Sequence, residues 1–204
     1  MPNGNSAWER FFEDLEDQLD SEWEAERAAL DSEAERLRLS RITLRERLVP
    51  LAVHGDRTLA IETADGTLLT GRLTALGADW AAVDVDARRA APVIVPLHGV
   101  VAIGMARADV VGSARDAAVG SALQQRMTFA FVLRDLARRR VPVTVQTSGG
   151  RAFSGTVDRA GADHLDLALH DAGAPRRTVD VTGYRLVTLA SISWARPDAP
   201  TALP

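Results

Sequence analysis

Seven arginines in the C-terminal half of the sequence are the residues whose type and clustering best fit a chemical role, the binding of phosphate groups. They are Arg138, Arg139, Arg140, Arg151, Arg159, Arg176 and Arg177. Phosphate contacts need positive charge gathered on one surface, and arginine supplies it at any physiological pH. The arginines therefore predict a contact surface for RNA or DNA.

Two observations favour a structural alternative for the same residues. The run from Arg138 to Arg140 follows a helical pattern, and the helix dipole favours cations at a C-terminus. The chain contains no lysine at all, so its arginine content also reflects a GC-rich coding bias. The acidic residues that would oppose a basic surface nearby are Asp158, Asp163, Asp166, Asp171 and Asp180.

No residue set in the sequence predicts catalysis, a cofactor or a metal. The absence of cysteine excludes disulfides, thiol catalysis and cysteine-rich zinc sites. His164 and Asp166 share one strand face and His170 follows six residues later, which is either an exposed polar face or a metal site without a recognised spacing. No Walker loop, GxSxG, HExxH or GxGxxG motif occurs. We expect a protein that is not an enzyme, with a cleft between two domains as the enzymatic alternative.

The first 38 residues predict an acidic helical arm. Residues 1 to 50 hold 13 acidic and 7 basic residues, and Ser6 with Glu9 has capping-box spacing. One face of this helix is apolar, through Trp8, Phe12, Leu15 and Leu19. Such a stripe either packs on its own domain or self-associates, or it docks a protein partner.

An internal repeat organises the rest of the chain. Gly71, Gly77 and Asp79 recur 84 positions later as Gly155, Gly161 and Asp163. Apolar residues that alternate around them recur at the same offset, which predicts strands with one buried face. Asp65-Gly66 and Gly149-Gly150 fit two-residue hairpin turns. Gly71 and Gly155 fit bends inside a strand, where glycine allows a small sheet to curl.

A helix precedes the strands in each copy, because RITLRERL at 41–48 resembles RMTFAFVL at 126–133. Ser113 with Asp116 offers a start for the second helix, and Pro142 ends it. The last two strands of the copies match at an offset of 92, so the second copy has eight extra residues in a loop. Trp80 begins the third strand of the first copy, as a core residue or as a binding aromatic.

A helix followed by five short antiparallel strands, with a bent second strand that carries glycine, resembles the Sm-like family of small SH3-like barrels. The resemblance covers residues 41–104 and 126–194, and its motif glycines are Gly66, Gly71, Gly150 and Gly155. It implies RNA binding in a pocket formed by polar residues of the third-strand region. By spacing, those positions are Gly77, Ala81, Gly161 and Leu165, none of which carries a polar side chain. The whole chain also resembles proteins of high-GC actinobacteria, some of which are labelled Fis-type regulators.

We therefore expect an α+β protein with an acidic helix and two repeated Sm-like antiparallel barrels. The expected parts are an arm (1–38), a first unit (39–106), a linker with a second unit (107–196) and a disordered tail (197–204). The predicted function is non-enzymatic interaction or scaffolding in a regulatory setting, with nucleic-acid binding by the second unit as the alternative. No apolar run is long enough for a membrane span and no secretory signal is recognisable, so a cytoplasmic location without membrane or cofactor is expected.

Overall fold

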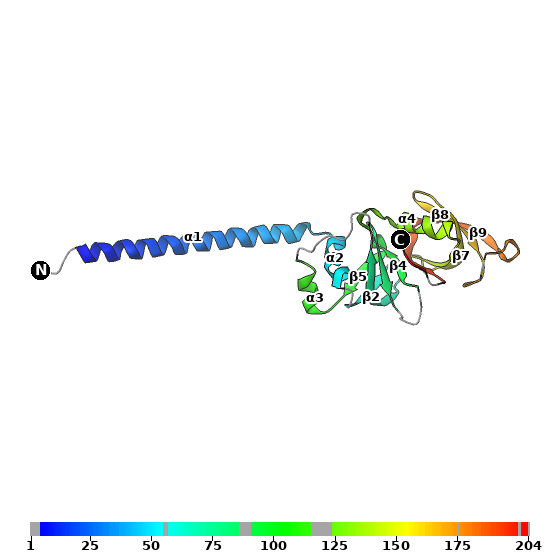
Figure 1. Cartoon of the computed structure of the whole chain (residues 1–204), viewed down its shortest axis with the longest axis horizontal. Helices are drawn as coiled ribbons and strands as arrows, with labels where there is room; N and C mark the ends of the chain where they lie inside the picture. Colours follow the sequence, from blue (N-terminus) through cyan, green and yellow to red (C-terminus); the bar gives the residue numbers. More distant parts are fainter. Residues whose placement is uncertain are drawn as a thin grey trace. The chain divides into compact units, whose positions relative to one another are not determined.

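The computed structural model of the chain describes residues 5–54, 57–85, 91–115, 124–174, 176–199 and 201–203. It divides into two compact units, Met1–Ile42 and Thr43–Pro204 (Figure 1). Mixed α-helix and antiparallel β-sheet make up the described chain, so the expected α+β class is confirmed.

The first unit is the single helix α1 (Asn5–Arg41). Four of its large apolar side chains are exposed among the described residues, namely Trp23, Leu30, Leu37 and Leu39. At about 100° per residue, positions 23, 30 and 37 lie on the same side of an α-helix as positions 8, 12, 15 and 19, whereas position 39 lies on the other side. The side chains of Trp8, Phe12, Leu15 and Leu19 lie outside the described residues, so the predicted docking stripe remains a prediction.

The second unit begins with helix α2 (Leu44–His54). Thr43 caps this helix through a reciprocal pair of hydrogen bonds, in which the Glu46 N–H donates to the Thr43 hydroxyl (3.2 Å) and the Thr43 N–H donates to the Glu46 carboxylate (2.7 Å). Five strands follow α2: β1 (Thr58–Thr63), β2 (Leu68–Leu76), β3 (Trp80–Asp84), β4 (Val93–Pro96) and β5 (Val100–Gly104). A short helix, α3 (Arg107–Gly112), comes next.

The second half of this unit begins with helix α4 (Phe129–Arg138). Thr128 caps α4, because its side chain accepts a hydrogen bond from an amide of the first turn. The predicted start at Ser113 is wrong: Ser113 ends α3, and its buried hydroxyl accepts from Arg47 at 2.8 Å. A Ser-x-x-Asp spacing marks a helix start only where a helix follows it. The other residue of this pattern, Asp116, lies outside the described residues.

Five further strands complete the second half: β6 (Pro142–Thr147), β7 (Ala152–Ala160), β8 (His164–Leu169), β9 (Gly183–Thr188) and β10 (Ile192–Pro197). All ten strands form one antiparallel sheet in the order β5-β1-β2-β3-β4-β10-β6-β7-β8-β9. The two halves therefore share one sheet through the β4–β10 pair, with β5 and β9 at its ends.

Two glycines allow the long second strand of each half to pass close to its neighbour. A Cβ atom on Gly71 would lie 2.1 Å from the Asp84 carbonyl oxygen, and one on Gly155 would lie 2.0 Å from the Ala168 carbonyl oxygen. The register then shifts by one residue just beyond each glycine, between Leu73 and Ala75 and between Val157 and Arg159. These positions confirm the predicted strand bends.

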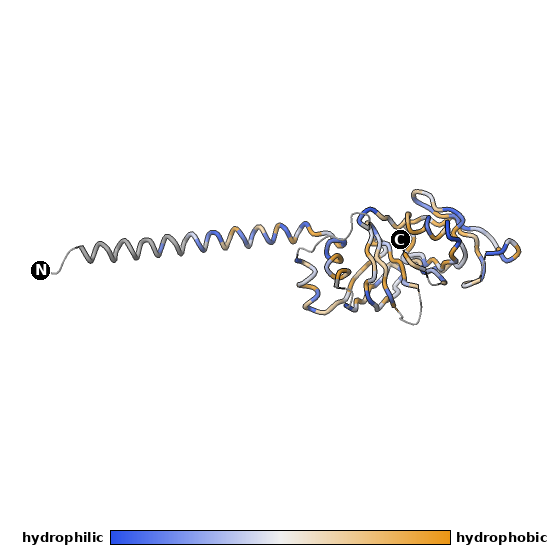
Figure 2. The backbone as a smooth tube through the Cα atoms, viewed as in Figure 1, coloured by the Kyte–Doolittle hydropathy of each residue, from blue (hydrophilic) through white to orange (hydrophobic). Residues whose placement is uncertain are grey.

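Two apolar clusters lie under the sheet, and the boundary between them does not follow the sequence. The first half encloses Leu48, Leu59, Ile61, Leu73 and Val83, among others. The second cluster surrounds α4, yet it includes Trp80, Ala82 and Ile94 from the first half. Figure 2 shows apolar residues along the strands of the second unit. Trp80 is completely buried and its indole N–H donates to the Met127 carbonyl (2.9 Å), so Trp80 is a core residue.

The residues after β10 contact the body of the second unit, although a tail was expected from 197 onward. Asp198 accepts a hydrogen bond from Thr144 (3.1 Å), and the Ala202 carbonyl accepts one from Arg139 (2.9 Å). Leu203 packs against the core cluster around α4.

Candidate nucleic-acid interface

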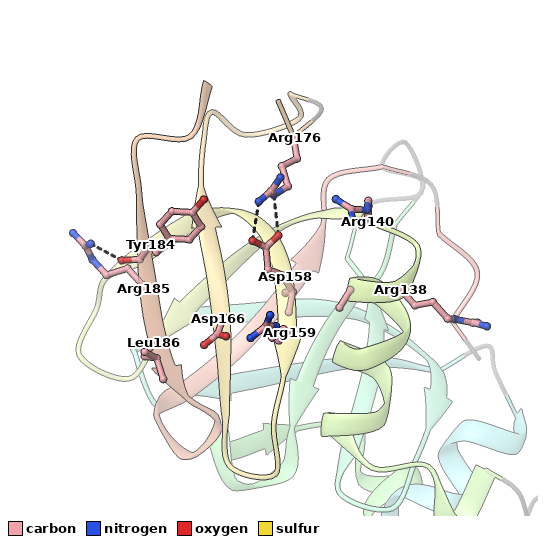
Figure 3. Close-up of a pocket in the computed structure, with 11 residues that line it drawn as sticks. Arg138, Arg140, Asp158, Arg159, Asp166, Arg176, Tyr184, Arg185 and Leu186 are labelled. Carbon is pink, nitrogen blue, oxygen red and sulfur yellow. Dashed lines mark hydrogen bonds and ion pairs between the residues drawn. The ribbon is translucent and has the colours of Figure 1, made fainter. Parts of the chain in front are cut away.

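An open pocket of about 730 Å³ lies in the second half, between the C-terminal end of α4 and strands β7 to β9 (Figure 3). Eleven residues line it: Ala137, Arg138, Arg140, Val157, Asp158, Arg159, Asp166, Arg176, Tyr184, Arg185 and Leu186. Five of these are arginines and two are aspartates, so the lining carries a positive excess. Four of the seven arginines predicted from the sequence are therefore brought together by the fold.

Arg140 enters the pocket from the end of α4 in an unusual backbone conformation. Its φ of 52° makes it the one non-glycine residue with positive φ in the described part of the chain. The Arg140 N–H donates to the Ala137 carbonyl (3.0 Å), and the Val141 N–H donates to the Leu136 carbonyl (3.0 Å). This is the helix ending in which glycine normally occupies the left-handed position. No carboxylate is paired with Arg140 among the described residues.

Arg138, two residues earlier, contacts its own helix. Its guanidinium donates to Asp135 one turn away at 2.6 Å, and its side chain is 78% exposed. In Figure 3 it extends away from the middle of the pocket. Arg138 therefore contributes more to the helix end than to the pocket, as the structural alternative predicts.

The floor of the pocket comes from β7 and β8. Asp158 occupies the bulge in β7, and Arg176 from the following loop binds its carboxylate through two contacts of 2.8 Å. Because of this hydrogen bond and charge, the pKa of Arg176 is raised above its usual value. Arg159 lies directly opposite Asp166 in the strand register, and Figure 3 shows the two side chains pointing toward each other.

The remaining wall is β9, which supplies Tyr184, Arg185 and Leu186, none of them predicted from the sequence. Tyr184 is 59% exposed, and Arg185 donates a hydrogen bond to the Tyr184 carbonyl (2.8 Å). Arg185 lies two residues before the buried Val187, so the two share one face of the strand. The strand period alone therefore predicts that Arg185 faces the core. An arginine in the place of an apolar strand residue was the signal that could have identified it.

The other three predicted arginines lie elsewhere. Arg139 donates to Asp135 (2.8 Å) and to the Ala202 carbonyl, which makes it a structural residue. Arg151 lies over the ring of Phe153, 5.4 Å from its centroid. Arg177 is exposed in the loop before β9. None of the three lines the pocket.

The histidine cluster considered for a metal does not form one in the described part of the chain, where no group of three potential ligands is found. His170 is buried, and its Nε2 lies 2.8 Å from the Thr156 hydroxyl, so the expected exposed face is wrong for this residue. His164 is partly exposed and lies 2.7 Å from Asp163. That hydrogen bond and the imidazole charge lower the pKa of Asp163.

No protein-family model matches the chain, and no match is found among curated proteins. Within the described residues, no helix is both long enough and apolar enough to cross a membrane. Chemically, the described lining of the pocket offers guanidinium groups, two carboxylates and one exposed aromatic ring. This donor set can bind an anionic ligand and stack a planar ring.

Proposed function

We propose that the chain is a non-enzymatic binding protein whose C-terminal half binds single-stranded nucleic acid in the arginine pocket. The observation that carries the proposal is the convergence of arginines from three separate segments, the end of α4, strand β7 and the loop before β9, on one concave surface. The lining holds five arginines against two aspartates, and this excess of positive charge attracts an anionic ligand.

The charge balance inside the pocket supports an anionic ligand. Asp158 neutralises Arg176, and Asp166 faces Arg159 across the strands. Arg140 has no carboxylate partner among the described residues, although its backbone conformation is strained. Strain at a residue that points into a pocket supports a functional reason for keeping its side chain.

The shape and the aromatic group favour a single strand over a duplex. A pocket of about 730 Å³ exceeds the space of an isolated phosphate and has the size of typical ligand pockets. Tyr184 offers a ring on which a base can stack, an interaction open to every base when the bases are not paired.

The fold interpretation that accompanies this proposal is a tandem of two Sm-like units. Its support is the pairing register: Thr63 is opposite Val100 in the first half, and Thr147 is opposite Ile192 in the second. The Sm-like pocket positions Ala81 and Leu165 are completely buried and apolar. The arginine pocket is therefore proposed as a separate site on this fold.

The test is a fluorescence-polarisation titration of the full chain with labelled oligo-uridine and oligo-thymidine over a series of salt concentrations. The pocket variant is Arg140→Ala/Arg159→Ala, and the matched control is Arg151→Ala/Arg177→Ala, which removes the same charge outside the pocket. Two lost phosphate contacts should weaken binding by roughly a hundredfold, and lower the slope of log affinity against log salt by about 1.4.

The control variant should keep the affinity and the salt slope of the wild type. Equal losses in the two variants would mean that only diffuse charge is at work, and the proposed pocket would be wrong. Absence of binding at low salt for both oligonucleotides would reject the function itself.

A second candidate function is protein scaffolding through α1, supported by the exposure of Trp23, Leu30 and Leu37, three of the four exposed large apolar side chains described in this helix, along one side of it. Apolar side chains on one side of an otherwise charged helix favour contact with a partner helix or groove. The titration separates the two candidates, since a scaffold that works through α1 gives no oligonucleotide affinity that depends on Arg140 and Arg159.

A further inference from the structure

Helix α1 exposes its side chains all around in its C-terminal half. Each described side chain from Trp23 to Leu37 is exposed, the large apolar ones included. A helix in a protein gains most of its stability from the packing of an apolar face, and a helix of 37 residues offers a long face for such packing. The exposed apolar side of α1 is therefore a surface for a partner.

The apolar positions of α1 repeat every 11 residues. Three sets of residues have this spacing: Trp8, Leu19 and Leu30; Phe12, Trp23 and Ala34; Leu15, Glu26 and Leu37. Eleven residues make three turns of a helix with about 3.67 residues per turn, so these nine positions form a straight stripe along one side. Such a repeat is typical of paired helices that wind around each other with a right-handed supercoil.

This stripe matches itself when a second copy of α1 runs in the opposite direction. If Leu19 of one chain lies opposite Leu30 of the other, every stripe position comes opposite another position of the same repeat. The resulting pairs are Trp8 with Arg41, Phe12 with Leu37, Leu15 with Ala34, Leu19 with Leu30, and Trp23 with Glu26. The stripe is thus complementary to itself over the length of the helix.

Glu26 is the one polar residue of the stripe, and its place distinguishes the two directions. In the antiparallel register Glu26 comes opposite Trp23, whose indole N–H can donate a hydrogen bond to a carboxylate. In a parallel pair Glu26 would come opposite Glu26 of the second copy, and two carboxylates would repel each other between apolar residues. The stripe therefore favours antiparallel helices.

The distribution of charge along α1 favours the same direction. Residues 8–24 hold eight acidic residues and one basic residue, whereas residues 25–41 hold four of each. Parallel helices would bring two acidic halves together, whereas antiparallel helices bring each acidic half beside a neutral one. A parallel pair would gain contacts between Glu33 and Arg38, but exposed ion pairs contribute little, and Arg38 already binds Glu35 of its own helix at 2.7 Å.

We propose that α1 pairs antiparallel with α1 of a second copy of the chain, in the register that sets Leu19 opposite Leu30. The same surface of each chain makes the contact, so the assembly closes at two chains. The inference goes beyond nucleic-acid binding, and it names a second copy as the partner that the scaffolding candidate leaves open.

The first test measures the mass of the full chain by sedimentation equilibrium at micromolar concentration. The wild type should have twice the chain mass of 21.9 kDa. Leu30→Glu places a charge in the stripe and should give the mass of one chain. Leu39→Glu is the matched control and should keep the dimer, since Leu39 is also exposed but lies on the other side of the helix.

The second test determines the direction by cross-linking, since the chain contains no cysteine of its own. Leu15→Cys and Ala34→Cys are treated separately and as a mixture with a short bis-maleimide reagent. In the proposed register position 15 lies opposite position 34, whereas the two copies of position 34 are about 28 Å apart along the helices. The mixture should therefore give a cross-linked dimer, and each variant alone should give little of it.

The cross-linking control replaces Ala34→Cys by Ser32→Cys, an exposed position on the opposite side of the helix. A mixture with no more dimer than this control would overturn the proposal. So would an Ala34→Cys sample that cross-links as strongly alone as in the mixture, because the helices would then be parallel. A wild type with the mass of one chain, or an equal loss of dimer in Leu30→Glu and Leu39→Glu, would also contradict it.

Two further measurements keep these outcomes separate from misfolding and from nucleic-acid binding. Near-ultraviolet circular dichroism should show the second unit folded in every variant, since Trp80 is buried there. The pocket variant Arg140→Ala/Arg159→Ala should keep the mass of the dimer. Failure of the dimer therefore leaves the oligonucleotide titration unaffected, and failure of the titration leaves the dimer unaffected.

Discussion

At the scale of single residues, the arginine pocket shows a conflict between stability and the proposed binding role. Arg140 holds a left-handed backbone conformation that glycine would adopt without steric cost. Its side chain nevertheless lines the pocket without a carboxylate partner in the described residues. The conflict can be tested by one substitution.

We predict that Arg140→Gly raises the free energy of unfolding by about 0.5–1 kcal/mol, because it relieves the left-handed strain, which outweighs the added entropy of glycine in the unfolded chain. The same substitution should weaken oligonucleotide binding. Urea denaturation and the polarisation titration measure the two effects. Arg139→Gly is the control, and it should destabilise the chain, since Arg139 has an ordinary helical φ of −84° and two structural contacts. An Arg140→Gly protein that is less stable than wild type would contradict the strain argument.

The seven arginines illustrate what could be predicted at this scale and what could not. Their clustering in sequence predicted a basic surface, and the fold brings Arg138, Arg140, Arg159 and Arg176 to one pocket. Sequence proximity could not separate Arg140 from Arg139, because the end of the helix turns one side chain toward the pocket and the other toward Ala202. Tyr184 and Arg185 joined the pocket through strand pairing, which no local pattern reveals.

At the scale of elements, the period of two and the glycines were sufficient to predict the strands. The bends at Gly71 and Gly155 follow from backbone contacts that leave no space for a Cβ atom. The predicted helix start at Ser113 was wrong, because a capping pattern is local whereas the position of a helix also depends on how its apolar face packs. Thr128 and the apolar face of α4, which packs into the second cluster, determine where the helix begins.

We predict that Gly155→Ala lowers the free energy of unfolding by about 3 kcal/mol or more, since the new methyl group would lie 2.0 Å from the Ala168 carbonyl oxygen and the strands must separate. Gly149→Ala serves as the control in the adjacent turn. No atom lies within 4 Å of its Cβ position, so the change should stay within about 0.5 kcal/mol. Chemical denaturation of both variants decides the matter, and equal effects would mean that the close approach does not restrict the strand.

At the scale of the molecule, residues 43 to 204 form one compact unit, although the sequence predicts two similar halves within it. The continuous sheet explains part of this unity, and shared packing explains the rest. Trp80, Ala82 and Ile94 are first-half residues that complete the core around α4. Sequence analysis predicted two halves but could not predict the strand pair that joins them, because residues that pack on another half have the same apolar pattern as those that pack on their own.

This shared core predicts a single cooperative unfolding transition for the second unit. Ile94→Ala should lower the free energy of unfolding by about 2–5 kcal/mol, as expected for a buried isoleucine. Hydrogen exchange measured by mass spectrometry can follow β1 and β8 separately, one strand from each half. We expect protection to fall by the same free energy in both strands, because neither half stays folded when the other opens. Val179→Ala, at a site 88% exposed, should change neither. If Ile94→Ala reduced protection in one half only, the halves would be independent domains, and the β4–β10 joint would be a contact between them and not part of a common core.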